Sequence, residues 1–132
     1  MTVRVLVVDD EPDVENLFRQ QFRREVRDGR YILDFALSGQ AALDKLDGCV
    51  GEQIILLVSD INMPGMSGLE LLPEVKVRRP ELPVFMISAY GDPDRVALAL
   101  ARGAQQFITK PVDFPRLKQD VSKVVADARG SG

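Results

Sequence analysis

Short apolar runs alternate along the chain with segments in which apolar residues recur every three or four positions. The runs predict five β-strands, over residues 3–8, 31–36, 54–58, 84–87 and 106–108. The other segments predict five α-helices, of which the fourth spans about residues 93–102 and the fifth about residues 114–128. Because strands alternate with helices, and because the strands are apolar almost throughout, we expect a parallel sheet with helices on both faces. The predicted fold class is a doubly wound α/β domain.

Local signals refine two of these helices. Ser38 stands where its side chain can cap the second helix, and S-G-L-E from Ser67 to Glu70 has the spacing of a capping box for the third. Pro73 falls inside the third helix, past its first turn, where it removes a backbone hydrogen bond and favours a kink. The sequence offers no functional reason for this proline.

Length and composition indicate one globular domain. The chain has 132 residues, of which 45% are apolar and 28% charged, enough for one core and too few for two. We predict a single domain over residues 1–128 and a tail, linker stub or cloning scar over residues 129–132. No apolar stretch approaches about 18 residues, and the N-terminus lacks a signal-peptide pattern, so we expect a cytoplasmic location and no membrane contact. The single cysteine, Cys49, fits a reducing compartment.

The charge distribution narrows the classes of partner and cofactor. A net charge of −3 argues against nucleic-acid binding by this domain through bulk electrostatics. A local exception is a basic stretch, which is either the solvated face of a helix or a surface that docks a partner: Arg19, Arg23, Arg24, Arg27 and Arg30. The chain has no histidine, so any metal must be held by oxygen ligands.

Chemically active side chains follow four of the five predicted strands. They are Asp9 and Asp10 after the first, Ser59 and Asp60 after the third, Ser88 after the fourth, and Thr109 and Lys110 after the fifth. In a parallel sheet the carboxyl ends of all strands lie at one edge, where ligands bind. Each group alone has an ordinary explanation as a helix cap, a loop hydroxyl or a surface charge. Their conjunction predicts a single site.

The types of residue at this edge indicate phosphoryl chemistry. Several aspartates close together repel unless a cation lies among them, and Mg²⁺ needs only one or two carboxylates while leaving room for phosphate oxygens. A lysine supplies a point charge suited to phosphate. An aspartate can also act as the nucleophile and become an aspartyl phosphate. We therefore predict Mg²⁺-assisted chemistry on a phosphoryl group.

Four segments carry a resemblance to a known family: VLVVDDEPD, SDINMPGMSGLELL, VFMISAYGD and GAQQFITKPVDF. In their order and spacing the chain resembles the receiver domain of two-component response regulators, the chemotaxis-regulator fold. The resemblance covers nearly the whole chain. It implies a flavodoxin-like, five-stranded parallel sheet in the order 2-1-3-4-5, flanked by five helices.

The resemblance also implies roles for individual residues. Asp60 is similar to the phosphoacceptor, and Lys110 to the lysine that contacts the phosphoryl oxygens, with a Lys110–Pro111 bond that is usually cis. Asp10 and Asp60 resemble direct Mg²⁺ ligands, Asp9 a ligand acting through water, and Asn62 the residue offering its backbone carbonyl. Mn²⁺ is expected to substitute for Mg²⁺.

Two further positions resemble the switch of the family. Ser88 occupies the place of the switch hydroxyl and Phe107 that of the switch aromatic, where phenylalanine can report only by packing. Asn62 and Tyr90, two residues after Asp60 and Ser88, are expected to flank the approach of the hydrolytic water and to tune the lifetime of the phosphoryl group.

The function implied is that of a signalling switch and not of an enzyme. Asp60 would accept a phosphoryl group from a histidine kinase or phosphotransfer protein, and the domain would support only its own phosphorylation and autodephosphorylation. The surface of the fourth helix, fifth strand and fifth helix would then signal to a partner, a fused output domain or a second copy.

Two alternatives belong to other classes. A Mg²⁺-dependent phosphatase or phosphotransferase of the haloacid-dehalogenase type would carry its acids as D-x-D and a cap insertion, whereas Asp9 and Asp10 are adjacent and the chain has no room for a cap. A flavodoxin-like mononucleotide carrier would need a hydroxyl- and glycine-rich loop after the first strand, where this chain has EPD.

Overall fold

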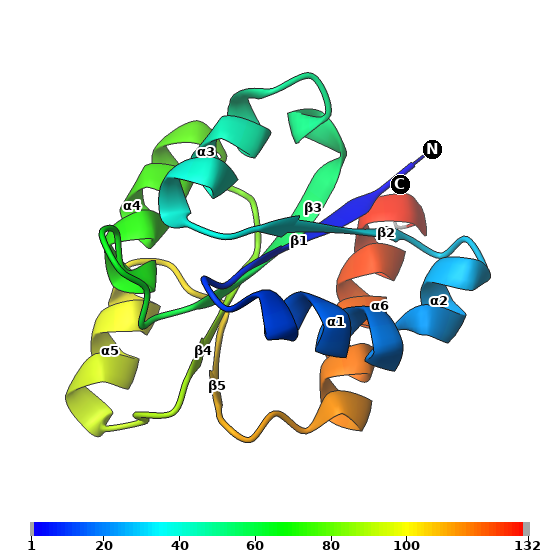
Figure 1. Cartoon of the computed structure of the whole chain (residues 1–132). Helices are drawn as coiled ribbons and strands as arrows, with labels where there is room; N and C mark the ends of the chain where they lie inside the picture. Colours follow the sequence, from blue (N-terminus) through cyan, green and yellow to red (C-terminus); the bar gives the residue numbers. More distant parts are fainter. Residues whose placement is uncertain (1, 131–132) are drawn as a thin grey trace.

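The computed structural model describes residues 2–130, which form a five-stranded parallel sheet in the order β2-β1-β3-β4-β5 (Figure 1). The strands are β1 (Arg4–Val8), β2 (Ile32–Ala36), β3 (Ile54–Asp60), β4 (Val84–Ser88) and β5 (Gln106–Thr109). The predicted fold class and strand order are confirmed. Strands β3, β4 and β5 extend one or two residues beyond their predicted ends, so that Asp60 and Ser88 are the last residues of their strands.

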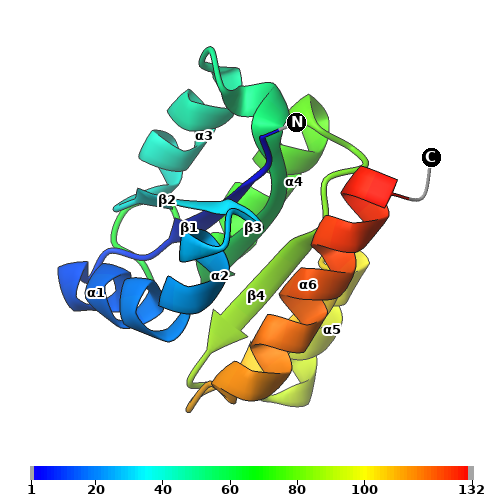
Figure 2. The same ribbon diagram turned by 90° about the vertical axis from the view of Figure 1, so that its right-hand side faces the viewer.

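Helices cover both faces of the sheet, as expected (Figure 2). They are α1 (Pro12–Gln21), α2 (Arg23–Arg27), α3 (Gly39–Asp47), α4 (Gly68–Arg78), α5 (Pro93–Ala101) and α6 (Phe114–Gly130), with a 3₁₀ turn η1 (Gly51–Gln53). Helices α3, α4 and α5 pack on one face through one apolar cluster, and α1 and α6 pack on the other face through a second. The helices shield most of both faces of the sheet from water, which explains why its strands are apolar almost throughout.

The prediction of five helices is wrong, because residues 2–130 contain six. The predicted first helix is divided at Phe22, whose backbone (φ −102°, ψ 11°) departs from helical geometry. Phe22 is fully buried; its ring stacks on Phe18 at 5.6 Å and meets Phe114 edge-on at 6.4 Å. Packing against an aromatic residue of α6 therefore accompanies a break that helical spacing alone did not indicate.

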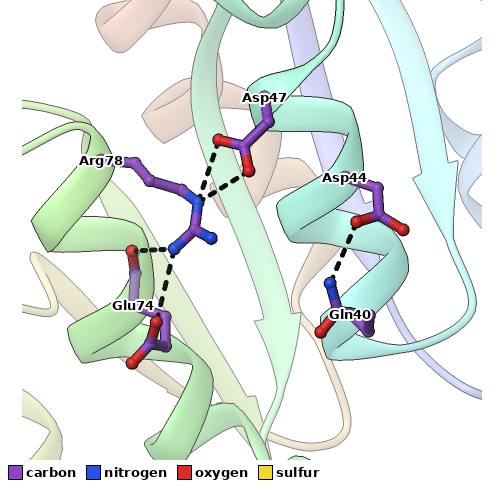
Figure 3. A network of polar contacts seen from close by, with 5 residues as sticks. All are labelled: Gln40, Asp44, Asp47, Glu74 and Arg78. Atoms are coloured by element: carbon purple, nitrogen blue, oxygen red, sulfur yellow. Dashed lines mark hydrogen bonds and ion pairs between the residues drawn. The ribbon is translucent and has the colours of Figure 1, made fainter.

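A polar network joins α3 to α4 on the surface (Figure 3). The Nε of Arg78 donates to both carboxylate oxygens of Asp47, at 3.0 and 3.1 Å, and its Nη1 donates to the backbone oxygen of Glu74 at 3.1 Å. Within α3, the Nε2 of Gln40 donates to Asp44 at 3.0 Å. Exposed ion pairs of this kind contribute only about 0–1 kcal/mol each, so the network supplements the apolar packing of these two helices.

The predicted helix signals are confirmed. The Oγ of Ser38 accepts a hydrogen bond from the backbone nitrogen of Ala41 at 3.1 Å. Ser67 and Glu70 form both halves of a capping box, each at 3.2 Å. At the other end of the chain, α6 continues to Gly130, two residues further than expected. The assignment of residues 129–132 as a tail stays a prediction, and residues 131 and 132 lie outside the described residues.

Pro73 lies inside α4, as predicted, and the structure provides a partner for the carbonyl that it leaves free. In an α-helix the nitrogen of residue 73 would bond the carbonyl of Leu69, but proline has no N–H to donate. The Nη1 of Arg102, at the end of α5, donates to this carbonyl oxygen at 2.7 Å. The proline thus opens a backbone acceptor that a side chain from the neighbouring helix occupies.

Across residues 2–130, none of the helices is both long enough and apolar enough to cross a membrane.

Candidate functional site

The pairing of the strands brings the predicted site residues to one edge of the sheet. Val8 of β1 pairs with Ser59 of β3, so the residues that follow them, Asp9 and Asp60, are neighbours. Ser88 of β4 pairs with Thr109 of β5, and Lys110 follows directly. Asp60 and Lys110, which are 50 positions apart, therefore meet because their strands end at the same edge, as predicted.

Three carboxylates form the centre of this edge. Asp9, Asp10 and Asp60 each present one carboxylate oxygen, and these oxygens lie within 4.8 Å of one another. Asp9 and Asp60 are buried, whereas Asp10 is partly exposed. Negative groups gathered at this range and partly shielded from water repel one another unless a cation lies among them.

The carboxyl group of Asp9 responds to this crowding. Burial, followed by the negative charges of Asp60 and Asp10, raises its pKa from 3.8 to about 6. The backbone N–H of Glu11, which donates to Asp9 Oδ1 at 3.0 Å, and the charge of Lys110 act in the opposite direction. A raised pKa means that the folded protein holds this carboxyl group in its ionised form only at a cost.

The two oxygens of Asp60 have different surroundings. Oδ2 accepts from the Nζ of Lys110 at 3.3 Å, across a part-buried ion pair. Oδ1 is buried and has no hydrogen-bond partner among the described residues. A buried carboxylate oxygen without a donor is costly, and a divalent cation would remove that cost. The donor set of three carboxylates, with this unpartnered oxygen, fits a hard, oxygen-seeking metal ion.

Ser88 and Lys110 are fixed through their backbones beside Asp60. Ser88 is fully buried; its Oγ accepts from the backbone nitrogen of Tyr90 at 3.0 Å, and its carbonyl accepts from the nitrogen of Lys110 at 2.9 Å. The Lys110–Pro111 peptide bond is cis, as the resemblance implied. The buried hydroxyl group thus lies at the end of the strand between those that carry Asp60 and Lys110.

The remaining predicted residues lie around this centre. Asn62 is exposed in the loop after β3, and its Oδ1 accepts from the Nη1 of Arg95 at 3.5 Å. Phe107 is half-buried in β5, beside Met86, and packs against the apolar cluster under α3, α4 and α5. Ser59 is fully buried and donates to the backbone oxygen of Asp60 at 2.9 Å, so its hydroxyl orients the chain next to the acid.

Two residues near the centre were not predicted. A Cβ atom on Gly68 would lie 2.4 Å from the backbone oxygen of Asp60. The backbone nitrogen of Gly68 donates to the backbone oxygen of Ile61 at 2.8 Å, so only glycine lets α4 begin there. Arg95 reaches Asn62 and lies over the ring of Tyr90, 5.6 Å from its centroid. The glycine directly after the capping serine is a sequence signal for the close approach of α4 to Asp60, whereas nothing in the sequence indicates the contacts of Arg95.

Comparison with known proteins places these features in a family. The model of the response regulator receiver domain matches residues 5–122. The response regulator protein PilR of Pseudomonas aeruginosa is 38% identical over 119 residues, which cover 90% of this chain and 25% of PilR. FleR, from the same organism, is 34% identical over 93% of this chain and 24% of FleR. The chain spans about a quarter of the length of these curated relatives.

Solved structures agree in fold. A CheY-like receiver domain protein from Methanospirillum hungatei superimposes with a TM-score of 0.85, at 26% identity and with all of both chains covered. The CheX–CheY–BeF3–Mg²⁺ complex from Borrelia burgdorferi includes a chain that is 34% identical, with a TM-score of 0.81, covering 92% of this chain and 88% of its own.

Proposed function

The chain belongs to the response regulator receiver domain family of two-component signalling, and we propose that its Asp60 accepts a phosphoryl group from a histidine kinase or phosphotransfer protein. Receiver domains are signalling switches and not classical enzymes, and this family membership does not fit the alternative of a phosphatase or phosphotransferase. One observation carries the proposal: Asp60 has one oxygen beside Lys110 and a second that is buried and unpartnered, next to two further acids.

The proposed reaction is an in-line transfer to a carboxylate. An oxygen of Asp60 forms a bond to phosphorus while the bond from phosphorus to the donor nitrogen breaks, and that nitrogen keeps the electron pair. Lys110, at 3.3 Å from Asp60, donates to the oxygens of the arriving group and offsets their charge. Because the chain contains no histidine, the phosphohistidine donor is another protein or module.

The acids around Asp60 are proposed to hold a metal ion. Asp10 and Asp60 would bind Mg²⁺ directly, Asp9 through water and Asn62 through its backbone carbonyl, with Mn²⁺ as a substitute. When bound, the ion neutralises charge on the phosphoryl oxygens. The burial of Asp9 and Asp60 and the raised pKa of Asp9 support this assignment, since both make the metal-free cluster costly. The complex from Borrelia burgdorferi, which contains BeF3 and Mg²⁺, supports it further.

Phosphorylation is proposed to act through Ser88 and Phe107. The product carries about 1.5 to 2 negative charges and new acceptor oxygens. The hydroxyl of Ser88 accepts from Tyr90 and is free to donate, so it can turn toward these oxygens. Phe107, which lies half-buried beside Met86 and on the strand next to that of Ser88, can then move into the space that Ser88 leaves. The surface that changes is the predicted one, which corresponds to α5, β5 and α6 in the structure.

The partners follow from this surface and from the relatives. PilR and FleR are about four times as long as this chain, which supports a fused output domain or a partner that reads the α5-β5-α6 surface, as well as a homodimer through it. The domain itself is proposed to bind neither nucleic acid nor membrane, and to catalyse only its own phosphorylation and dephosphorylation.

The direct test uses a small phosphodonor. Incubation with phosphoramidate and Mg²⁺ is expected to add one phosphoryl group, stable in acid and labile in base, seen by intact mass spectrometry. Asp60→Ala should abolish the adduct, and Asp94→Ala, an exposed acid in the first turn of α5, should leave it unchanged. Chelation of Mg²⁺ should also prevent it. An adduct that persists in Asp60→Ala, or its absence in the unchanged protein, would refute the proposal.

A further inference from the structure

A groove of about 400 Å³ opens between the first two helices and the edge of the sheet. It is lined by Arg19 of α1, by Arg23, Val26 and Arg27 of α2, and by Ile32 and Leu33 of β2. Within the part of the chain that the structure describes, strand β2 pairs only with β1, and its first two residues line the groove. Figure 1 shows α2 beside the start of β2, at the opposite end of the strand from α3. The groove therefore lies away from the carboxyl ends of the strands, where the acidic cluster is.

The rim of this groove carries positive charge that acids of the protein neutralise only in part. Its lining contains three arginines and no acid. The side chain of Arg23 makes no hydrogen bond or ion pair within residues 2–130. Among the same residues, the side chain of Arg27 has only Asp28 as a partner, at 3.8 Å, and the two side chains are 70% and 49% exposed. Arg19 pairs with Glu15 and lies over the ring of Phe35, 4.7 Å from its centroid, which holds its guanidinium against β2.

The floor of the groove is apolar and open to water. Val26 is 38% exposed and Ile32 is 37% exposed, although both are residues that normally lie inside a protein. Single exposed apolar side chains are ordinary, but here two from different elements line one concave surface. If the arginines formed only a solvated helix face, no apolar surface would be needed beside them, whereas here Val26 and Ile32 lie next to them.

We propose that the groove binds an extended segment of a partner protein in which acidic and apolar side chains alternate. Arg23 and Arg27 are four residues apart within α2, which corresponds to about 6 Å along a helix, and Arg19 lies in the preceding helix α1. Alternate side chains of an extended segment recur about every 6.6 Å. Carboxylates on one side of such a segment can therefore meet successive guanidinium groups, which bind carboxylates through bidentate hydrogen bonds. The intervening apolar side chains can contact Val26, Ile32 and Leu33.

Other occupants fit less well. A nucleic acid offers phosphates but no apolar side chains for the floor, and the net charge of −3 repels it. A membrane surface would need a convex or flat apolar patch, whereas this one is concave. Because the groove lies at the far end of the sheet from Asp60, the proposal does not depend on phosphorylation.

The probe is a synthetic heptapeptide in which glutamate alternates with valine and leucine, added to the ¹⁵N-labelled protein. Saturable shifts of the amide signals are expected at Val26, Ile32 and Leu33, with an affinity that weakens as salt is raised. Arg23→Glu should weaken binding at least about tenfold, and Val26→Ser should weaken it without altering charge. Arg116→Glu, the same change at an exposed position on α6, should alter the affinity less than about twofold.

Four results would overturn the proposal. They are the absence of saturable shifts at the groove, an equal loss of affinity in Arg116→Glu, equally tight binding of a peptide with serine in place of valine and leucine, and preference of the groove for a DNA duplex or for anionic vesicles over the peptide. Retention of native amide signals in Arg23→Glu and Val26→Ser separates loss of binding from loss of fold.

Discussion

Helices α4 and α5 both follow strands that end at the acidic edge of the sheet, yet they are attached to the domain in different ways. Helix α4 buries Leu71, Leu72 and Val75 completely. Helix α5 buries only Ala99, while two of its leucines, Leu98 and Leu100, are 40% and 48% exposed. The first helix is part of the hydrophobic core, and the second has little apolar contact with it.

Polar contacts hold α5 at both of its ends. Asp92 caps its start by accepting from the nitrogen of Arg95 at 2.9 Å, and the side chain of Arg95 reaches Asn62 and Tyr90. Beyond its last turn, Arg102 donates to the carbonyl of Leu69 in α4. Exposed contacts of this kind contribute about 1 kcal/mol or less each. Helix α5 can therefore shift at small cost while α4 stays in place, which suits a helix on the proposed switch surface.

The largest difference is expected from shortening one leucine in each helix. Leu72→Ala should lower the free energy of unfolding by about 3 to 4 kcal/mol, because it leaves a cavity in a closed core. Leu98→Ala should lower it by less than about 1 kcal/mol, since much of that side chain already contacts water. Urea unfolding curves of both variants give the comparison. Similar losses in the two would contradict the view that α5 is weakly packed.

A second prediction concerns the charged edge that both helices adjoin. The pKa of Asp9 is raised from 3.8 to about 6 in the folded protein, so the folded protein binds this proton more tightly than the unfolded chain does. The stability that this provides is fully present below pH 3.8 and is lost as the pH rises through 6. With metal chelated, unfolding curves of the unchanged protein should lose about 2 to 3 kcal/mol from this group between pH 4 and 7.

Asp9→Asn should remove this part of the pH dependence, and Mg²⁺ at pH 7 should restore stability to the unchanged protein by favouring the ionised carboxylates. If Asp9→Asn follows the same pH profile as the unchanged protein, the cost lies elsewhere. If the pH dependence is lost in Asp9→Asn, the acidic edge lowers the stability of the protein independently of the packing of α4 and α5.

A third, smaller difference is expected from the two helix caps. Ser67→Ala should lower global stability by about 1 kcal/mol, because α4 unfolds only with the core. Asp92→Ala removes a comparable cap from α5, but its effect should appear mainly as faster amide exchange within α5. Hydrogen exchange read by mass spectrometry, together with urea unfolding, distinguishes the two. Equal global losses with unchanged exchange in α5 would argue that both helices unfold as one unit.

The smallest effect tests the contact between the helices themselves. Pro73→Ala supplies an N–H for the carbonyl of Leu69, so Arg102→Ala should cost less in that background than in the unchanged protein. A coupling of about 0.5 to 1 kcal/mol is expected from a double-mutant cycle. Arg95→Ala, which does not contact that carbonyl, should be additive with Pro73→Ala. Additivity of Arg102→Ala as well would show that the proline has another role.

What the sequence predicted of the fold follows from burial. Fully apolar runs such as residues 54–58 have few alternatives to a buried parallel strand, and the meeting of Asp9 with Asp60 is a consequence of strand order. The break at Phe22 was not predictable, because this residue continues the helical spacing and its packing partner Phe114 is far along the chain. The terminal residues of strands and helices are similarly decided by contacts that the local pattern does not contain.

Within the candidate site, the chemically active groups were predictable and their supports were not. Asp60 and Lys110 are distinctive by residue type and by position after a strand. Arg95 and Arg102 are ordinary surface arginines in the sequence, since their partners are a side-chain amide and a backbone carbonyl on other elements. Long side chains that bond to backbone or amide groups leave no pattern of spacing, and only the folded structure identifies them.

The contact between Gly68 and the carbonyl of Asp60 has a consequence for reading natural variation in this chain. Position 68 carries no charge, no polar side chain and no apolar surface, so a replacement there would look conservative to any comparison of residue chemistry. Yet even one added methyl group would have to displace either the start of α4 or the backbone of Asp60. A variant with alanine at this position is therefore expected to lose the proposed phosphoacceptor activity while every acid, hydroxyl and lysine of the site is retained.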